Sequence, residues 1–337
     1  MLRQIGKRLL TAIPSLIGVI IVTFLLTRVL PGDAAAYFAG PAATPQAIEE
    51  IRGKVGLDRS WPEQFLRYVT DLGRGDFGAS LTTGQPVVAD IAARLPASAE
   101  LTLLGLFVAM AIAVPLGILA AVKQGSFIDH ACRVVATAGV SLPVFFTGLL
   151  LVYVFYFLLG WAPAPLGRLD IFHSPPPHVT GFYLIDSLLA GDLGLFRAAL
   201  APLVLPATTL AIFSIAPIAR MTRASMLAVL ASDFVRTARA SGLSPYRVII
   251  TYAFCNAMLP VVTTFGMVFS FLLGANVLVE KVFAWPGIGS YAVEALIASD
   301  YAPVQGFVLT MAVLYVMLNL AIDLLYGVID PRVRLEG

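Results

Sequence analysis

Residues that could carry out covalent chemistry are few in this chain of 337 residues, and none stands in a catalytic pattern. The sequence contains no G-x-x-x-x-G-K-[ST] loop that would cradle nucleotide phosphates. It also contains no H-E-x-x-H, G-x-S-x-G or S-x-x-K arrangement that would support hydrolysis. We therefore predict that the chain is not an enzyme. The only residue that could support an intramembrane enzyme is the single acid Asp323.

Side chains that bind metals are equally scattered. Cys132 and Cys255 lie far apart, without CxxC or CxxH spacing, and both are expected to be small buried hydrophobic residues. His173 and His178 flank three consecutive prolines, where a solvated loop explains them better than metal ligation does. We predict no metal site and no cofactor bound by this chain.

The composition places most of the chain in a membrane. Only 12% of the residues are charged, against about 25% in a globular protein. Hydrophobic residues make up 59% and the mean hydropathy is +0.88, which is more apolar surface than one aqueous core could hide. The fold class predicted is an all-α integral membrane protein, and the net charge of +2 gives no reason to expect nucleic-acid binding.

Six stretches without an ionisable side chain are long enough to cross a bilayer, which takes about 20 apolar residues. They are Leu9–Thr27, Leu101–Val122, Val134–Leu166, Ala198–Ala219, Val248–Val279 and Tyr301–Ile322, of which the third and fifth are long enough to include loop residues. The first follows a basic segment, as a signal peptide does, but its 19 residues exceed the roughly 7 to 15 of a signal core. We therefore expect a retained first helix.

The charges in the connecting segments predict the orientation. Segments 1–8, 123–133, 220–247 and 330–337 hold 12 Lys or Arg and 4 acids, whereas segments 31–100, 167–197 and 280–300 hold 9 and 15. The first set is cytoplasmic by the positive-inside rule. We therefore predict a multi-pass protein of the cell (inner) membrane with both termini in the cytoplasm.

The segment 31–98 contains the start and stop signals of two short helices, which we expect outside the membrane. Thr44 and Pro45 resemble a helix start and Gly56 a stop, and Ser60, Pro62 and Gly73 repeat the pattern. Further on, Ser98 is expected to cap the second span.

The segment 220–256 predicts a helical hairpin. Ser232 or Asp233 can cap a helix that Gly242 ends in a left-handed conformation, and Ser244 starts the next helix. Arg236 and Arg239 share one face, while Phe234, Val235 and Ala238 offer apolar contacts to another protein. Composition alone supports equally well a basic helix that touches anionic lipid headgroups.

Polar residues inside the spans are scarce. Asp323 lies one turn after Asn319 on the sixth span, and a structural role within the helix bundle is preferred to ligand contact. Arg28 ends the first span, where its side chain can reach the interface as an anchor.

The stretch from Asp233 to Arg247, with Asn-Ala-Met-Leu-Pro at 256–260, closely resembles the cytoplasmic loop of the dipeptide/oligopeptide permeases of ABC importers. These permeases are inner-membrane components of binding-protein-dependent transport systems, and the resemblance is to the first-permease type. Motifs in the expected order extend it over nearly the whole chain: Leu-Pro-Gly-Asp at 30–33, Gly-Asp-Phe-Gly at 75–78, Arg-Leu-Pro at 94–96, Trp-Pro-Gly at 285–287 and Asp-Pro-Arg-Val-Arg at 330–334.

The resemblance implies a type I ABC importer permease fold with six transmembrane helices. Its parts would be a tail and first span at 1–30, an extracytoplasmic helical segment at 31–98 and a permease core at 99–337, with the coupling loop at 220–256. This loop is similar to the "EAA" element, although Arg236-Thr237-Ala238 stands where the general pattern has Glu-Ala-Ala. The implied coupling residues are Asp233, Phe234, Arg236, Thr237, Ala238, Arg239, Gly242, Leu243, Ser244 and Arg247.

The same resemblance implies the partners. They are a second homologous permease, two ATP-binding subunits that hold ATP and Mg, an extracytoplasmic substrate-binding protein, membrane lipid and a peptide substrate. An ion-coupled secondary transporter is the alternative, although such carriers usually need acidic or histidine relays at mid-depth.

Overall fold

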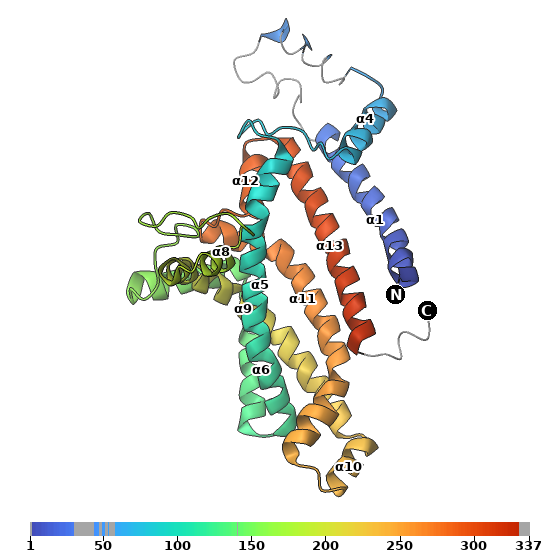
Figure 1. Cartoon of the computed structure of the whole chain (residues 1–337), viewed down its shortest axis with the longest axis vertical. Coiled ribbons are helices and arrows are strands. Elements are labelled where there is room, and N and C mark those ends of the chain that lie inside the picture. The colour runs from blue at the N-terminus through green and yellow to red at the C-terminus, as the bar shows by residue number, and fades with distance from the viewer. Residues whose placement is uncertain are drawn as a thin grey trace. The chain divides into compact units, whose positions relative to one another are not determined.

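The computed structural model describes residues 2–29, 44–46, 49–50, 53, 58–139 and 141–329, and these residues are mostly helical (Figure 1). The chain divides into two compact units. Unit 1 comprises Met1–Pro96 and Gly287–Met317, and unit 2 comprises Ala97–Pro286 and Leu318–Gly337. Each unit is described by itself.

The described residues of unit 1 form three whole helices and parts of two more. They are α1 (Leu2–Val29), α4 (Trp61–Gly73), the start of α5 (Val87–Val122), α12 (Ile288–Ile297) and the first part of α13 (Tyr301–Ile329). Helix α4 begins after Ser60, has proline in its first turn and ends at Gly73, as the sequence predicts. It packs on α1, where the Phe24 and Phe65 rings meet edge to face at 5.2 Å.

Two buried carboxylates organise the remainder of unit 1. Asp300 accepts hydrogen bonds from the Ser80 hydroxyl at 2.8 Å and from the Thr82 amide at 3.0 Å. Asp90 accepts one from the Tyr291 hydroxyl at 2.9 Å. These bonds hold the turn that precedes α5 against α12 and α13.

Unit 2 contains the rest of α5 and the helices that follow it. They are α6 (Phe127–Gly139), α7 (Val144–Leu151), the π-helical η1 (Val152–Leu158), α8 (Tyr183–Leu189), α9 (Leu193–Leu230), α10 (Asp233–Ala240), the π-helical η2 (Arg247–Phe254) and α11 (Cys255–Val282). The main core lies between α5, α7, α9 and α11. A Cβ on Gly117 would lie 2.8 Å from the Ala219 carbonyl oxygen, so glycine permits α5 and α9 to approach backbone to backbone.

Four helices among the described residues are long and apolar enough to cross a membrane. They are Val87–Val122, Leu193–Leu230, Arg247–Val282 and Tyr301–Tyr326, and the segments Leu10–Leu25 and Val144–Leu158 form shorter apolar helices. The predicted second, fourth, fifth and sixth spans are therefore confirmed as long apolar helices. The predicted first and third spans coincide with the two shorter ones.

One expectation is wrong, and two others lie largely or wholly outside the described residues. The stretch Val134–Leu166 includes non-helical residues, as its length suggested, because α6 ends at Gly139 and α7 begins at Val144 after Pro143. The cap predicted at Ser98 is wrong, because α5 runs unbroken through this position and the Ser98 hydroxyl donates instead to Glu280. The predicted helix from Thr44 to Gly56 and the 330–334 motif lie largely or wholly outside the described residues.

Candidate functional site

The predicted hairpin is present as α10, the turn after it and η2, which together we call the α10 hairpin (residues 233–254). Figure 1 shows α10 near the end of unit 2 that lies farthest from α8. Gly242 adopts the predicted left-handed conformation with φ 74°, and the amide of Leu243 donates to the Ala238 carbonyl, which closes the helix end. Ser232 occupies the N-cap position, but its hydroxyl donates backwards to the Val229 carbonyl.

The inner face of the α10 hairpin is a small apolar core. Val235 is fully buried, and Ala238 and Val248 are nearly so. They pack together with Val229, Leu230 and Leu243. The hairpin is therefore fastened to the end of α9. This chain therefore covers Val235 and Ala238, and the coupling role of the hairpin residues stays a prediction.

The outer face of the hairpin carries the polar and aromatic groups. Exposed along it are Asp233, Phe234, Arg236, Thr237, Arg239, Ser244, Tyr246 and Arg247. The pair between Arg236 and Asp233 spans 3.3 Å on an exposed surface, where such pairs contribute little to stability. Tyr246 lies on the same face, 73% exposed, and was not among the predicted coupling residues.

Helix α9 carries the hairpin as a rigid extension. Its 38 residues correspond to about 57 Å, far more than the roughly 30 Å of a hydrocarbon core. Residues 220–230 were expected to belong to a loop, but they form the last part of α9. Met226 in this part is buried together with Ala121, Ala253 and Ala257. The hairpin cannot move independently of α9 without exposing this cluster.

An ion pair fastens α6 to the same part of α9. Arg223 Nε lies 2.7 Å from Asp129 Oδ1, and its NH2 lies 2.8 Å from Oδ2. The Gly125 amide also donates to Asp129, at 3.0 Å. These hydrogen bonds, with Arg223 the strongest influence, hold the pKa of the Asp129 carboxyl well below its usual range.

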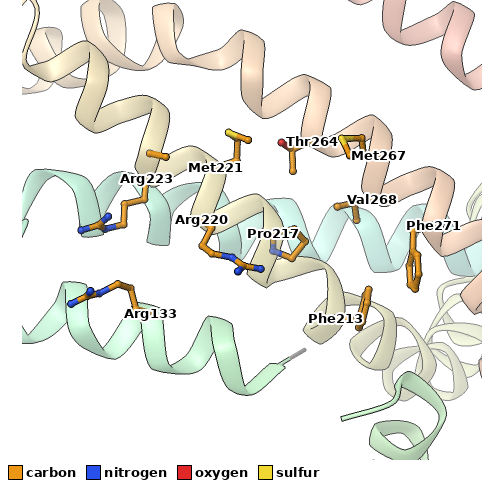
Figure 2. Close-up of a pocket in the computed structure, with 11 residues that line it drawn as sticks. Arg133, Phe213, Pro217, Arg220, Met221, Arg223, Thr264, Met267, Val268 and Phe271 are labelled. Carbon is orange, nitrogen blue, oxygen red and sulfur yellow. The ribbon is translucent and has the colours of Figure 1, made fainter. Parts of the chain in front are cut away.

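A groove of about 940 Å³ opens beside this ion pair, between α9 and α11, with α6 contributing Arg133 (Figure 2). Phe213 and Phe271 stack at one end with ring centroids 4.8 Å apart. Arg133, Arg220 and Arg223 lie towards the other end (Figure 2). Met221, Met267 and Val268 supply apolar wall. Nothing in the sequence singled out this groove, because its residues come from three separate helices.

The two polar residues of the sixth span lie on the part of α13 that belongs to unit 2. Asn319 is exposed and Asp323 is partly buried. Neither is without an interaction partner. Their predicted structural role stays a prediction.

Buried charges occur at positions that sequence reasoning missed. Glu280 in α11 is buried and accepts hydrogen bonds from Ser98 and Asn276. Glu100 is buried beside Arg168, whose NH2 lies 2.6 Å from its Oε2. Both acids lie just outside the predicted spans. They were therefore assigned to loops, because the spans were defined as stretches without an ionisable side chain.

The histidine loop contains a side-chain pair. His173 Nδ1 lies 2.7 Å from Asp170 Oδ1, which lowers the pKa of Asp170. In the part of the chain that the structure describes, no three His, Cys, Asp or Glu residues are grouped so that they could hold a metal ion.

The fold can be compared with a solved structure. The chain resembles one described as inward-facing conformations of the MetNI methionine ABC transporter, with a TM-score of 0.51 and 17% identity over 70% of this chain and 93% of that one. This likeness concerns the fold alone. The fold therefore defines a class, the all-helical membrane proteins with an ABC transporter permease-like structure.

The chain belongs to the family of binding-protein-dependent transport system inner membrane components, which it matches over residues 113–335, and the family's N-terminal part matches residues 1–102. It is 44% identical to the probable D,D-dipeptide transport system permease protein DdpB of Escherichia coli K12 over 95% of this chain and 94% of that protein. It is 43% identical to the di/tripeptide transport system permease protein DppB of Pseudomonas aeruginosa UCBPP-PA14, over 99% of both chains. The dipeptide transport system permease protein DppB of Escherichia coli K12 is 40% identical, also over 99% of both.

Family membership confirms the resemblance seen in the sequence motifs. The chain is a multi-pass inner-membrane permease subunit without catalytic chemistry of its own, and it works with ATPase and binding-protein partners. The ion-coupled carrier that the sequence left as an alternative does not fit this membership.

Proposed function

We propose that this chain is the permease subunit of an importer for dipeptides or oligopeptides and that it receives the ATP-driven motion through the α10 hairpin. The single observation that carries the coupling role is the division of the hairpin into two faces. Val235 and Ala238 fasten it to α9, while Phe234, Arg236, Arg239 and Tyr246 are exposed. A partner that pushes on the outer face would therefore move α9.

The peptide substrate is supported by the relatives. Three permeases align with nearly the whole chain at 40 to 44% identity, and their names assign them to transport systems for D,D-dipeptides, di/tripeptides and dipeptides. Selectivity in such systems also depends on the binding protein, so the proposal is limited to short peptides as a class.

The proposed assembly follows from the sequence expectations. Six spans would place both termini and the α10 hairpin in the cytoplasm, with the segment 31–98 outside, in a type I importer arrangement. A second homologous permease would complete the translocation pathway, and two ATP-binding subunits would bind ATP and Mg. The great length of α9 supports this arrangement, because it separates α8 and α10 by more than a bilayer's thickness.

A charge-reversal experiment tests the coupling role. The double variant Arg236→Glu and Arg239→Glu should release the ATP-binding subunits on affinity purification and abolish peptide uptake, while the protein still reaches the membrane. Arg197→Glu is the matched control, because Arg197 is exposed at the start of α9. Full retention of the ATP-binding subunits by the double variant would overturn the proposal.

A further inference from the structure

The groove between α9 and α11 differs in chemistry from end to end. One end is aromatic, formed by the stacked Phe213 and Phe271. The other end is cationic, formed by Arg133, Arg220 and Arg223. Figure 2 shows the two ends with the methionines and Pro217 between them. Such a groove suits a small molecule that is apolar over part of its length and anionic at one end.

Arg220 is the cation available to a ligand. Arg223 is held by both oxygens of Asp129, and Arg133 Nε lies 3.8 Å from the same carboxylate. Arg220 makes no hydrogen bond or ion pair within the described residues, and its side chain is exposed towards the groove (Figure 2). Two guanidinium groups therefore share one carboxylate and the third is not paired with it, which leaves an excess of positive charge at this end.

None of the described residues that line the groove is acidic. The charges of the lining therefore favour the anionic end of a ligand over an ammonium group. A guanidinium binds a carboxylate with two parallel hydrogen bonds, which makes the match directional as well as electrostatic.

The length of the groove selects among anions. Phe213 and Arg220 are seven positions apart on α9, which corresponds to about 10 Å along the helix. Two to three extended residues span about 7 to 10 Å. The acyl chains of one lipid leaflet need about 15 Å, half of the hydrocarbon thickness, and would overrun the stacked rings.

We infer that this groove binds the carboxyl-terminal end of a short peptide, with Arg220 pairing with the terminal carboxylate and apolar side chains lying between Met267 and the Phe213–Phe271 stack. The inference rests on the proposed peptide substrate. It adds a binding site within the permease itself, on the helix that also carries the α10 hairpin.

Photolabelling of the purified complex with its partner subunits, in nanodiscs and without the binding protein, tests the site. The probe is alanyl-p-benzoylphenylalanine. After digestion of the permease, mass spectrometry measures the labelled fragments that contain Met221 or Met267. We expect saturable labelling that falls at least fivefold in Arg220→Gln and is partly restored in Arg220→Lys. The same dipeptide with a carboxyl-terminal amide should label the wild type only as weakly as the free acid labels Arg220→Gln.

Equal labelling of wild type and Arg220→Gln, or of the acid and the amide, would overturn the inference. So would loss of labelling when phosphatidylglycerol replaces phosphatidylcholine, since this would show that a lipid headgroup with a net negative charge occupies the site. Retention of the ATP-binding subunits by Arg220→Gln checks that the variant is folded. Peptide uptake by the complete wild-type system is measured separately, so that failure of the groove and failure of the proposed substrate are distinguished.

Discussion

Arg223 on α9 and Asp129 on α6 meet through two hydrogen bonds of 2.7 and 2.8 Å, so that one guanidinium edge covers one carboxylate. Arg223 lines the cationic end of the groove and precedes the residues of α9 that lead to the α10 hairpin. It therefore connects the candidate ligand site and the candidate coupling site through a single rigid helix. A change in either site that shifts α9 must carry α6 with it or break this pair.

Asp129→Asn should lower the midpoint of thermal unfolding in detergent, because the amide keeps the shape but loses the ionic hydrogen bonds to Arg223. The folded-state pKa of Asp129 is depressed, so its contribution is fully present above the ordinary carboxyl pKa and is lost only as pH falls through the depressed value. The difference in midpoint between variant and wild type should therefore be constant from about pH 8 to pH 5.

Asp170→Asn is the control for this measurement. Asp170 also has a lowered pKa, through His173, but both side chains are exposed. Its substitution should change the midpoint little. A similar loss for both variants would contradict the structural role assigned to Asp129.

The close approach of α5 and α9 predicts a second effect. Gly117→Ala would place a Cβ 2.6 Å from Thr222 Cβ, and overpacking of this kind costs about 1 to 3 kcal/mol. Gly274→Ala is the matched control, since nothing lies within 4 Å of its Cβ position in α11. Chemical unfolding in the same detergent should show a loss for Gly117→Ala only, and equal behaviour would refute the close contact.

The sequence could predict those features of the structure that depend on a few consecutive residues. The α10 hairpin was predicted with its end at Gly242, because caps and left-handed glycines are properties of a few consecutive residues. The sequence could not show that Ala238 faces inward, because burial there depends on Val229 and Val248 from other helices. The groove was missed for the same reason.

Errors at the ends of the spans have another cause. The extension of α9 beyond Ala219 contains Arg220 and Arg223, which a search for uninterrupted apolar residues must treat as loop. In the structure one of them is paired with Asp129. Charged residues end a stretch defined by hydropathy, but α9 continues through them to Leu230.

Glu280 provides a third prediction. Its buried carboxylate accepts from the Ser98 hydroxyl and the Asn276 amide group. Glu280→Ala would remove this acceptor from the Ser98 hydroxyl and leave the Asn276 amide group only the Ser98 carbonyl, at 3.3 Å. A buried donor left unsatisfied costs about 1 to 3 kcal/mol. Glu280→Gln keeps an acceptor oxygen and should be milder. The amount of folded protein recovered from membranes measures the difference, and equal recovery of the two variants would argue against the network.

Val235 and Phe234 are neighbours on α10 with opposite environments, and this difference allows anchoring and docking to be measured separately. Val235→Ala removes two fully buried carbons, which should destabilise the attachment of α10 to α9 by about 1.6 kcal/mol. Since 1.4 kcal/mol is a factor of ten, the opened state should be roughly tenfold more populated. Trypsin cleavage after Arg236 and Arg239 should accelerate accordingly, because proteolysis follows the population of the open form.

Phe234→Ala removes a side chain that is 45% exposed, so trypsin should cleave this variant at nearly the wild-type rate. Its affinity for the ATP-binding subunits should nevertheless fall, because an exposed aromatic side chain is a typical anchor of a protein interface. Val235→Ala, by contrast, presents an unchanged outer surface and should lose affinity only through the cost of ordering α10. If Phe234→Ala accelerated proteolysis as strongly as Val235→Ala, the division of the hairpin into an anchoring face and a docking face would be wrong.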